Sequence, residues 1–458
     1  MEELARMNIK KLQQKLRTKK LKIAIVGFGY IGTCIGAVLA EKGYKVIGID
    51  KKKKTVEEIN SGTTSINEPG LKELVAKNVQ KKNLSATIDF SHIKEADVII
   101  ITVGTPLGNN YEPDMSQIIA ASKEVSKYLR RGHVVILKST VPPYTTENVV
   151  KPILKQNQVV DFALAFCPER LAEGKAIEEF QIIPVVIGGL NEESTEIAAL
   201  FWKEALGVKT IKVSNACTAE MTKLADNLWI DLNIALANEI AILCDKMGID
   251  ALEVIDAANT LPKVNYNVNI LVPSMGVGGY CLTKDPWFVY HLGKKYDLEL
   301  KTPVTSRTIN DTMPHYTFEL IKKELEKQGK KLEESKIAVL GIAFKNNTGD
   351  CRFTPTRYTI ELLEKSGCGL SICDPWVNEV DARKVTSREL VPTIEEAIEN
   401  ADCIAFLTGH TEFKDFPIEK IARLAKPHAI LLDGRIFFNR EQIKKIKRYD
   451  LIYKGIGR

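Results

Sequence analysis

The stretch Lys22-Ile-Ala-Ile-Val-Gly27-Phe-Gly29-Tyr-Ile-Gly32 decides the fold of this chain. An apolar run ends at one glycine, a second glycine follows two residues later, and a third lies within an apolar helical stretch that runs through Ala40. A further strand pattern, Tyr44-Lys-Val-Ile-Gly-Ile-Asp50, then ends in a carboxylate. This order of strand, tight turn, helix and strand predicts a dinucleotide-binding Rossmann unit.

Each glycine of this pattern, and the acid that follows it, has a physical task. Gly27 permits the turn, Gly29 lets backbone N–H groups reach a pyrophosphate at the helix N-terminus, and Gly32 allows the helix to pack closely on the sheet. Asp50 can accept hydrogen bonds from both hydroxyls of an adenosine ribose, which favours NAD over NADP. The lysines at positions 51–54 soften the rejection of a 2′-phosphate.

Composition excludes several classes of protein. The 458 residues are 45% hydrophobic and 27% charged, as in ordinary globular proteins of more than one domain. A net charge of +6 without a long basic tract argues against nucleic-acid binding. Nine cysteines without a C-x-x-C pair indicate reduced thiols in a cytoplasmic protein, and six scattered histidines predict no metal site. We expect no signal peptide and no membrane span.

The first 20 residues are basic and have the spacing of an amphipathic helix. Leu4, Leu12 and Leu16 are its few large apolar side chains. We expect a solvated or subunit-contacting extension.

The chain repeats its own strand pattern. Lys22-Ile-Ala-Ile-Val-Gly27 returns as Lys336-Ile-Ala-Val-Leu-Gly341, and the segments that end at Asp50 and begin at Ala96 return at 370–374 and 401–408. The fold class predicted is therefore α/β, with two doubly wound Rossmann-like domains at 21–213 and 331–458 joined by a central helical domain at 214–330 with a long helix. The second Rossmann-like domain lacks the glycine fingerprint.

Two cations follow the strand that ends at Gly341. Lys345 and Arg352 precede the next helix, where cationic side chains suit a phosphate group. A solvated loop is the alternative. We expect a nucleotide-like ligand different from the one bound by the first domain.

The pattern from 215 to 247 predicts one long, mostly apolar helix. Polar side chains recur along one stripe at three- and four-residue spacings, namely Glu220, Lys223, Asn227 and Asp231. For Glu220 and Asp231 we expect a salt-bridged helix surface. Lys223 and Asn227 are site candidates because they pair a cation with an amide.

The segment Gly276-Val-Gly-Gly-Tyr-Cys-Leu-Thr-Lys-Asp285 contains a candidate nucleophile. Cys281 and Asp285 are four residues apart, so they share a face if the turn continues into a helix, and Lys284 is near enough to favour a thiolate. The alternative is a cysteine packed as a small apolar residue.

Together these motifs resemble the UDP-glucose/GDP-mannose dehydrogenase family from about residue 21 to the end. The further matching motifs are Val103-Gly-Thr-Pro106, Ser139-Thr140-Val-Pro-Pro, Pro168-Glu169 through Gly174, Phe344-Lys345 with Asp350-x-Arg352, and Asp433-Gly-Arg435. The resemblance implies that the C6 hydroxymethyl of a nucleotide sugar is oxidised twice, to a uronic acid, with two NAD and a thiohemiacetal and thioester on Cys281.

The resemblance also implies roles for individual residues. Lys223 and Asn227 would stabilise oxygen charge, Asp285 would position water or assist proton transfer, and Glu173 would assist as a general base. The implied cofactor contacts are Gly27, Gly29, Tyr30, Ile31, Gly32, Asp50, Thr105 and Thr140. The implied substrate contacts are Glu169, Arg170, Lys223, Asn227, Gly278, Lys345, Arg352 and Arg435.

The resemblance implies that the substrate is a UDP-sugar and that the chain forms a homodimer through the central helix. Cys167-Pro-Glu-Arg170 through Gly174, with Asp285-Pro-Trp-Phe288, resembles the enzymes that oxidise UDP-N-acetylmannosamine or UDP-N-acetylglucosamine. Tyr280, Lys284 and Glu173 favour the alternative, a UDP-glucose 6-dehydrogenase. More distant alternatives are a two-electron hydroxyacid dehydrogenase, against which Cys281 and the complete third domain speak, and a nonenzymatic nucleotide-binding regulator.

Overall fold

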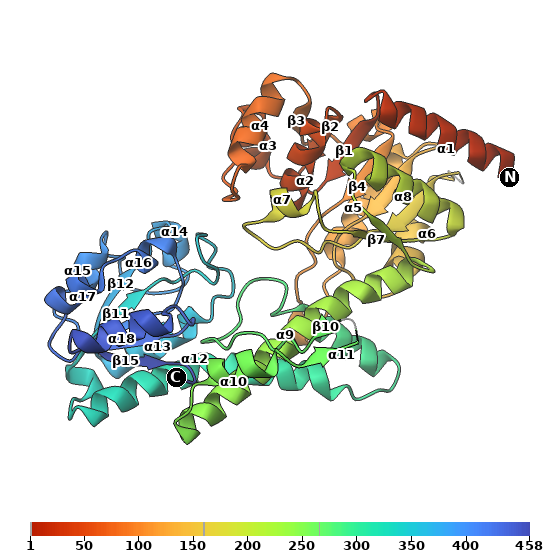
Figure 1. The fold of residues 1–458 in the computed structure, drawn as a ribbon. Helices are drawn as coiled ribbons and strands as arrows, with labels where there is room; N and C mark the ends of the chain where they lie inside the picture. Colours follow the sequence, from red (N-terminus) through yellow and green to blue (C-terminus); the bar gives the residue numbers. More distant parts are fainter. Residues whose placement is uncertain (1, 159–160, 265) are drawn as a thin grey trace. The chain divides into compact units, whose positions relative to one another are not determined.

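The computed structural model describes residues 2–158, 161–264 and 266–458 (Figure 1). Contacts divide the chain into two compact units, residues 1–226 with 287–296 and residues 227–286 with 297–458. Two helices, α9 (Ala216–Met247) and α11 (Asp285–Lys295), contribute residues to both units. Of the residues expected in the N-terminal extension, Met1 and the side chain of Leu4 lie outside the described part.

The first unit is built on an eight-stranded sheet in the order β3-β2-β1-β4-β5-β6-β7-β8. Its strands are β1 (Lys22–Val26), β2 (Lys45–Ile49), β3 (Leu84–Thr87), β4 (Val98–Ile101), β5 (Val134–Leu137), β6 (Ala163–Phe166), β7 (Val185–Gly189) and β8 (Thr210–Lys212). These strands pair in parallel except β6 with β7, which are antiparallel. The winding reverses between β1 and β4, the position at which doubly wound sheets bind their ligands.

Helices cover both faces of this sheet. They are α1 (Glu2–Arg17), α2 (Tyr30–Glu41), α3 (Lys53–Asn60), α4 (Leu71–Gln80), α5 (Ser116–Tyr128), α6 (Lys151–Lys155), α7 (Ala176–Glu179) and α8 (Glu192–Leu206), with η1 (Phe90–Glu95), η2 (Asn109–Tyr111) and η3 (Thr146–Val150). Along β1, Ile23 and Ile25 enter one core while Ala24 and Val26 enter the other. Both faces are buried, which explains why the strands read as continuous apolar runs.

The N-terminal extension is part of the first unit, and the expectation of a solvated segment is wrong for Leu12 and Leu16, whereas Lys10, Lys11, Gln14 and residues 17–20 are exposed as expected. Helix α1 packs against α8, and Leu12 and Leu16 are buried in the core between them. Lys15 forms an ion pair with Asp97 at 2.6 Å, and the Tyr44 hydroxyl donates to the Leu16 carbonyl. Two buried leucines on one face are enough to dock a helix whose other side chains are basic.

The second unit contains a five-stranded parallel sheet in the order β12-β11-β13-β14-β15, with strands β11 (Lys336–Leu340), β12 (Gly369–Cys373), β13 (Cys403–Phe406), β14 (Ile430–Asp433) and β15 (Ile452–Gly455). Its helices are α10 (Ala251–Ala258), α12 (Lys301–Lys327), α13 (Thr356–Ser366), α14 (Glu379–Ala382), α15 (Ile394–Ile398), α16 (Thr411–Lys414), α17 (Ile418–Leu424), α18 (Arg440–Arg448) and η4 (Leu332–Glu334). A short hairpin pairs β9 (Pro262–Lys263) with β10 (Tyr266–Asn267).

The predicted fold class is confirmed. The repeated segments form equivalent strands, because β1 lies between β2 and β4 as β11 lies between β12 and β13. Ile23 pairs with Val98 as Ile337 pairs with Cys403, so the two halves are also in the same register.

The stripe of polar residues on α9 is buried, so the expected salt-bridged surface is wrong for Glu220 and Asp231. Both carboxylates are fully buried. Asp231 forms an ion pair with Arg307 of α12 at 2.7 Å and accepts a hydrogen bond from Asn310. Glu220 accepts hydrogen bonds from the backbone amide and hydroxyl of Thr146.

By length and composition α9 could cross a membrane, and 39% of its most apolar window is buried. Its buried carboxylates nevertheless make their contacts inside the fold, as described above. These contacts are typical of a core helix of a globular protein, in which each buried charge has a partner.

Burial raises the pKa of Glu220 from its ordinary value of 4.5 to about 7, against the hydrogen bonds from Thr146, which lower it. The folded state therefore holds the Glu220 proton more tightly than the unfolded state, and this group costs stability as the pH rises from about 4.5 to about 7. Glu220→Gln keeps the oxygen that accepts from Thr146 but cannot ionise. We predict that, between pH 5 and pH 8, the free energy of unfolding of this variant rises relative to that of the wild type by up to about 3 kcal/mol.

The measurement is the free energy of unfolding in urea at the two pH values. Glu147→Gln, at an exposed carboxylate on η3, is the matched control and should leave the pH dependence unchanged. Equal pH dependence in Glu220→Gln and the wild type would contradict the assigned shift.

Candidate active site

The turn between β1 and α2 has the form that a dinucleotide requires. Gly27 has φ +90°, and a Cβ on Gly32 would lie 2.2 Å from the Gly27 carbonyl oxygen. Nothing lies within 4 Å of a Cβ built on Gly29, which begins α2 without a side-chain cap. The first amides of α2 therefore have no side chain across them, which suits a pyrophosphate. Asp50 accepts from the Phe28 amide at 2.8 Å.

Glu68, which the sequence analysis missed, ties the fingerprint to residues 167–175, a loop that contains Glu169 and Glu173 and is called here the loop of acidic residues. The Tyr30 hydroxyl donates to the Glu68 carboxylate, and the Gly174 amide donates to the same oxygen at 2.7 Å. Burial and this carboxylate raise the pKa of Tyr30 above its ordinary range. The Tyr30 hydroxyl thus joins two loops of the protein, and the expected contact of Tyr30 with the cofactor stays a prediction. Ile31, the next residue, is half-buried against the same core.

Lys138 is a second residue that the sequence analysis missed. This buried lysine at the end of β5 donates to the Pro168 carbonyl at 3.1 Å and lies 3.5 Å from the Glu169 carboxylate. Glu169 also accepts from the Leu171 amide, so its carboxylate is engaged in holding its own loop. A lysine directly after a buried strand is the only sequence signal for this contact.

Other expected site residues of the first unit lie on neighbouring loops. The Thr105 hydroxyl donates to the Thr140 carbonyl at 2.6 Å, which joins the loops that follow β4 and β5. Arg170 forms an ion pair with Asp226 at 2.8 Å. The pKa of the buried Cys34 thiol is raised by burial and by the charges of nearby carboxylates, among which is Glu173. Lys223 is buried on α9.

In the second unit a buried cluster surrounds Asp285. Asn227 of α9 donates from its amide nitrogen to one oxygen of Asp285, and Lys284 forms an ion pair with the other. The three side chains are buried. The cation that was expected to favour a thiolate on Cys281 therefore has a carboxylate partner.

Cys281 lies on the turn that leads into α11. The Asp285 amide donates to the Cys281 carbonyl at 2.9 Å, so the turn continues into the helix and the two residues share a face, as expected. Of the nine cysteines Cys281 is exposed, Cys217 and Cys351 are half-buried and the other six are buried. Exposure argues against the alternative of a cysteine packed in the core.

The glycine-rich segment before Cys281 lies against the loop that follows β11. A Cβ on Gly278 would lie 2.5 Å from Phe344, and the Gly279 amide donates to the Arg352 carbonyl at 3.0 Å. Arg352 forms an ion pair with Asp350. The second unit thus brings the candidate nucleophile next to the expected phosphate-binding loop.

Arg435 joins the same segments. Its guanidinium donates to the carbonyl oxygens of Leu407 at 2.9 Å and Gly276 at 3.2 Å. Burial lowers its pKa to about 10. Carbonyl partners leave its positive charge uncompensated, which suits an anionic ligand nearby.

Across residues 2–158, 161–264 and 266–458, no group of three or more His, Cys, Asp or Glu side chains is arranged to hold a metal ion.

Models of three domains of one family match the chain. They are the NAD-binding, central and UDP-binding domains of the UDP-glucose/GDP-mannose dehydrogenase family, at residues 21–206, 217–312 and 338–440. A UDP-N-acetyl-D-mannosamine dehydrogenase of Methanococcus vannielii is 35% identical over 94% of this chain and 96% of its own length.

Two solved structures are similar along nearly the whole chain. The UDP-D-ManNAc dehydrogenase of Pyrococcus horikoshii has a TM-score of 0.85 and 34% identity, with 96% of this chain and 99% of that one covered. A UDP-glucose dehydrogenase of Pyrobaculum islandicum has a TM-score of 0.85 and 26% identity, with 95% and 98% covered.

The fold and the fingerprint define an NAD-dependent oxidoreductase that acts on a UDP-sugar. The chain belongs to the UDP-glucose/GDP-mannose dehydrogenase family.

Proposed function

We propose that this enzyme oxidises C6 of UDP-N-acetylmannosamine to the uronic acid, with two NAD consumed for each sugar. The observation that carries the proposal is the exposed thiol of Cys281 beside the buried cluster of Asn227, Lys284 and Asp285. The names of the relatives at 34–37% identity support the N-acetylated substrate.

The proposed chemistry uses one covalent adduct. Bound NAD supplies the hydride acceptor for each oxidation. After the first hydride leaves C6, the Cys281 sulfur adds to the aldehyde carbon and forms a thiohemiacetal. Loss of the second hydride gives a thioester, and water cleaves its C–S bond to release the carboxylate and the thiol.

The neighbouring polar groups would stabilise the negative charge that develops in these steps and would assist the proton transfers. Lys223 and Asn227 stabilise the oxygen that gains negative charge, and Glu173 assists proton transfer as a general base. Asp285 accepts from Asn227 and Lys284, so it orients the side-chain amide of Asn227. It would also assist the water that cleaves the thioester. A buried carboxylate with two donors is held in a single geometry, which a reacting group needs.

The substrate would be held by charged side chains and by one glycine. We assign Lys345, Arg352 and Arg435 to the diphosphate, because they supply cations on and beside the loop after β11. Gly278 lets the backbone approach the sugar, and Glu169 and Arg170 lie on the loop of acidic residues. We assign Gly27, Gly29, Tyr30, Ile31, Gly32, Asp50, Thr105 and Thr140 to the NAD site.

The alternative substrate is UDP-glucose, which the sequence favours at Tyr280, Lys284 and Glu173. Lys284 pairs with Asp285, so its identity is explained by that ion pair. The Tyr280 ring lies edge-on to Phe353 and 5.6 Å from the Arg352 guanidinium. Tyr280 and Lys284 thus have partners within the protein, so their identities are weak indicators of which UDP-sugar is the substrate.

We further propose that two copies of the chain associate through α9 and that the enzyme works in the cytoplasm. Large apolar side chains follow one face of α9 at near-heptad spacing and are exposed, namely Trp229, Leu232, Leu236, Leu243 and Met247. An exposed apolar stripe of this length is typical of a helix that packs against a partner.

We also propose that the three domains of the chain span residues 21–213, 214–330 and 331–458.

Steady-state kinetics on UDP-sugars test the substrate. We predict that kcat/KM is highest for UDP-N-acetylmannosamine, lower for UDP-N-acetylglucosamine and about tenfold or more lower for UDP-glucose, because a site built for an acetamido group leaves polar groups unpaired without it. GDP-mannose is the control for the nucleotide. A higher kcat/KM for UDP-glucose would show that Tyr280 was the better guide.

The thiol is tested by stoichiometry. With limiting sugar, the wild type should form about two NADH per sugar and release the uronic acid. Cys281→Ala should form no uronic acid and still bind NAD, while Cys217→Ala, at a half-buried thiol, should behave as the wild type. A wild-type plateau at one NADH with free aldehyde would indicate a two-electron dehydrogenase, and no NADH from any sugar would favour a regulator.

The association through α9 is tested by light scattering after gel filtration. We predict that the wild type has twice the 51.1 kDa mass of one chain and that Leu236→Glu with Leu243→Glu has the mass of one chain, because a charge on each helix is buried at the contact. Ile88→Glu, at an exposed apolar side chain of the first unit, is the control. A variant that keeps the wild-type mass would exclude α9 as the interface.

A further inference from the structure

Both halves of the chain use one carboxylate to hold the turn after their first strand. The Phe28 amide donates to Asp50 at 2.8 Å, and in the second half the Ile342 amide donates to Asp374 at 2.7 Å. Each of these acids lies directly after the strand paired with the turn, in equivalent register. Asp374 is therefore the structural counterpart of Asp50, which we assign to the ribose of NAD.

The two carboxylates differ in what surrounds them. Asp50 is half-buried, whereas Asp374 is buried and accepts four further contacts, from the amides of Ala343, Trp376 and Val377 and from His410. Burial would raise the pKa of Asp374, but the contact with His410 and the backbone amides hold it below its ordinary value. An acid with so many internal donors has no capacity left for the hydroxyls of a ribose.

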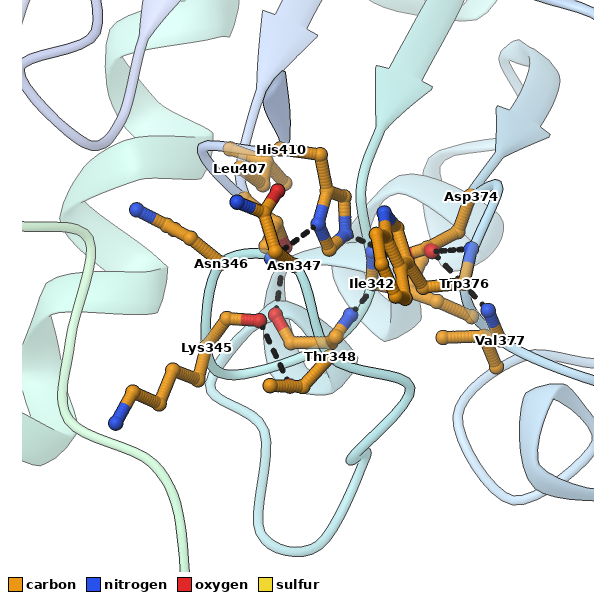
Figure 2. A network of polar contacts seen from close by, with 12 residues as sticks. Ile342, Lys345, Asn346, Asn347, Thr348, Asp374, Trp376, Val377, Leu407 and His410 are labelled. Atoms are coloured by element: carbon orange, nitrogen blue, oxygen red, sulfur yellow. Dashed lines mark hydrogen bonds and ion pairs between the residues drawn. The ribbon is translucent and has the colours of Figure 1, made fainter. Parts of the chain in front are cut away.

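His410 connects this carboxylate to the loop that contains Lys345. Its Nδ1 accepts from the Asn347 amide at 2.8 Å, so the proton of the neutral ring lies on Nε2, which is 3.2 Å from Asp374 (Figure 2). The imidazole is fully buried, and the rings of Trp376 and Phe413 lie on two of its sides.

The segment from Thr408 to Thr411 fastens the same loop at further points. The Thr408 hydroxyl donates to the Ala343 carbonyl at 2.6 Å, and the Gly409 amide donates to the Asn346 side chain at 2.8 Å. The side chain of Asn347 exchanges hydrogen bonds with Thr411. These bonds lie on both sides of Lys345 in the sequence.

The Lys345 side chain points away from this network. Figure 2 shows its amino group directed away from His410 and Asp374, while its carbonyl accepts from Thr348 at 3.0 Å. The backbone around Lys345 is thus fixed from one side, and the cation is presented on the other.

We propose that His410 is a positioning residue for substrate binding: it locks the loop 342–348 so that Lys345 is presented to the diphosphate of the nucleotide sugar. This inference rests on the proposed function for the role of Lys345. Asp50 in the first half is assigned to the ribose of NAD, whereas Asp374, at the equivalent position of the second half, anchors a substrate loop inside the protein. A loop held in its binding conformation before the ligand arrives avoids the entropy cost of ordering it afterwards.

Two substitutions separate the two hydrogen bonds of His410. Glutamine can place an amide nitrogen near the position of Nε2 and keep the contact with Asp374, whereas asparagine can place an oxygen near the position of Nδ1 and keep the contact with Asn347. We predict that His410→Gln raises the Kd for UDP and the KM for the nucleotide sugar about five- to tenfold, as expected for the loss of one hydrogen bond. His410→Asn should have a smaller effect.

Several measurements separate positioning from a general loss of structure. In both variants the Kd for NAD and the kcat at saturating sugar should stay within about twofold of the wild type. In a Lys345→Ala background, His410→Gln should have no further effect on the Kd for UDP, because a residue that acts through Lys345 is not additive with it. His428→Gln, at an exposed histidine of the same unit, is the matched control.

Isothermal titration calorimetry with UDP gives the decisive outcomes. If the wild type does not bind UDP, the proposed function fails. If the wild type binds UDP and His410→Gln binds it equally well, or the effects of His410→Gln and Lys345→Ala add, the inference about His410 alone is overturned. If His410→Gln does not fold, Thr411→Val removes a fastening of the same loop at an exposed position and should raise the Kd for UDP by a smaller factor.

Discussion

A backbone amide that donates to a carboxylate on the neighbouring strand is the contact on which both α/β sheets depend. In each half the chain must reverse after an apolar strand, at Gly27 and at Gly341, both with φ near +90°. The amide of the next residue faces the end of the adjacent strand and would be buried without a partner. Asp50 and Asp374 accept it through a charge-assisted hydrogen bond, which is stronger than one between neutral groups.

The central part of the molecule depends on buried charges that have partners. Asp231 with Arg307 joins α9 to α12, and Asn227 with Asp285 joins α9 to the start of α11. Removing one partner of such a pair would leave a charge in an apolar environment, so the contacts specify one packing of these helices. The turn that carries Cys281 is consequently held by a buried contact between Asn227 and Asp285, two residues that also have parts in the proposed chemistry.

How much could be predicted depended on how far apart in the sequence the partners lie. The dinucleotide fingerprint, the repeat and the turn at Cys281 follow from spacings of a few residues, and the structure has the expected local geometry for each. The burial of Leu16 against α8, the bond from Thr146 to Glu220 and the contact of Glu68 with Gly174 join segments 70 or more residues apart. No local pattern identifies such partners, so Glu68 and Lys138 were missed and the burial of Glu220 and Asp231 was not foreseen.

By itself the sequence determined the class of fold and the cofactor, because a tight turn that admits a pyrophosphate needs glycine at fixed spacing and an acid at the end of the next strand. It also determined the candidate nucleophile, since a thiol and a carboxylate four residues apart share a helical face. Only the tertiary structure decided which of two matching carboxylates, Asp50 or Asp374, is left accessible to a ligand. The reason is that His410, 36 residues from Asp374, occupies one carboxylate, and no such side chain lies over the other among its described contacts.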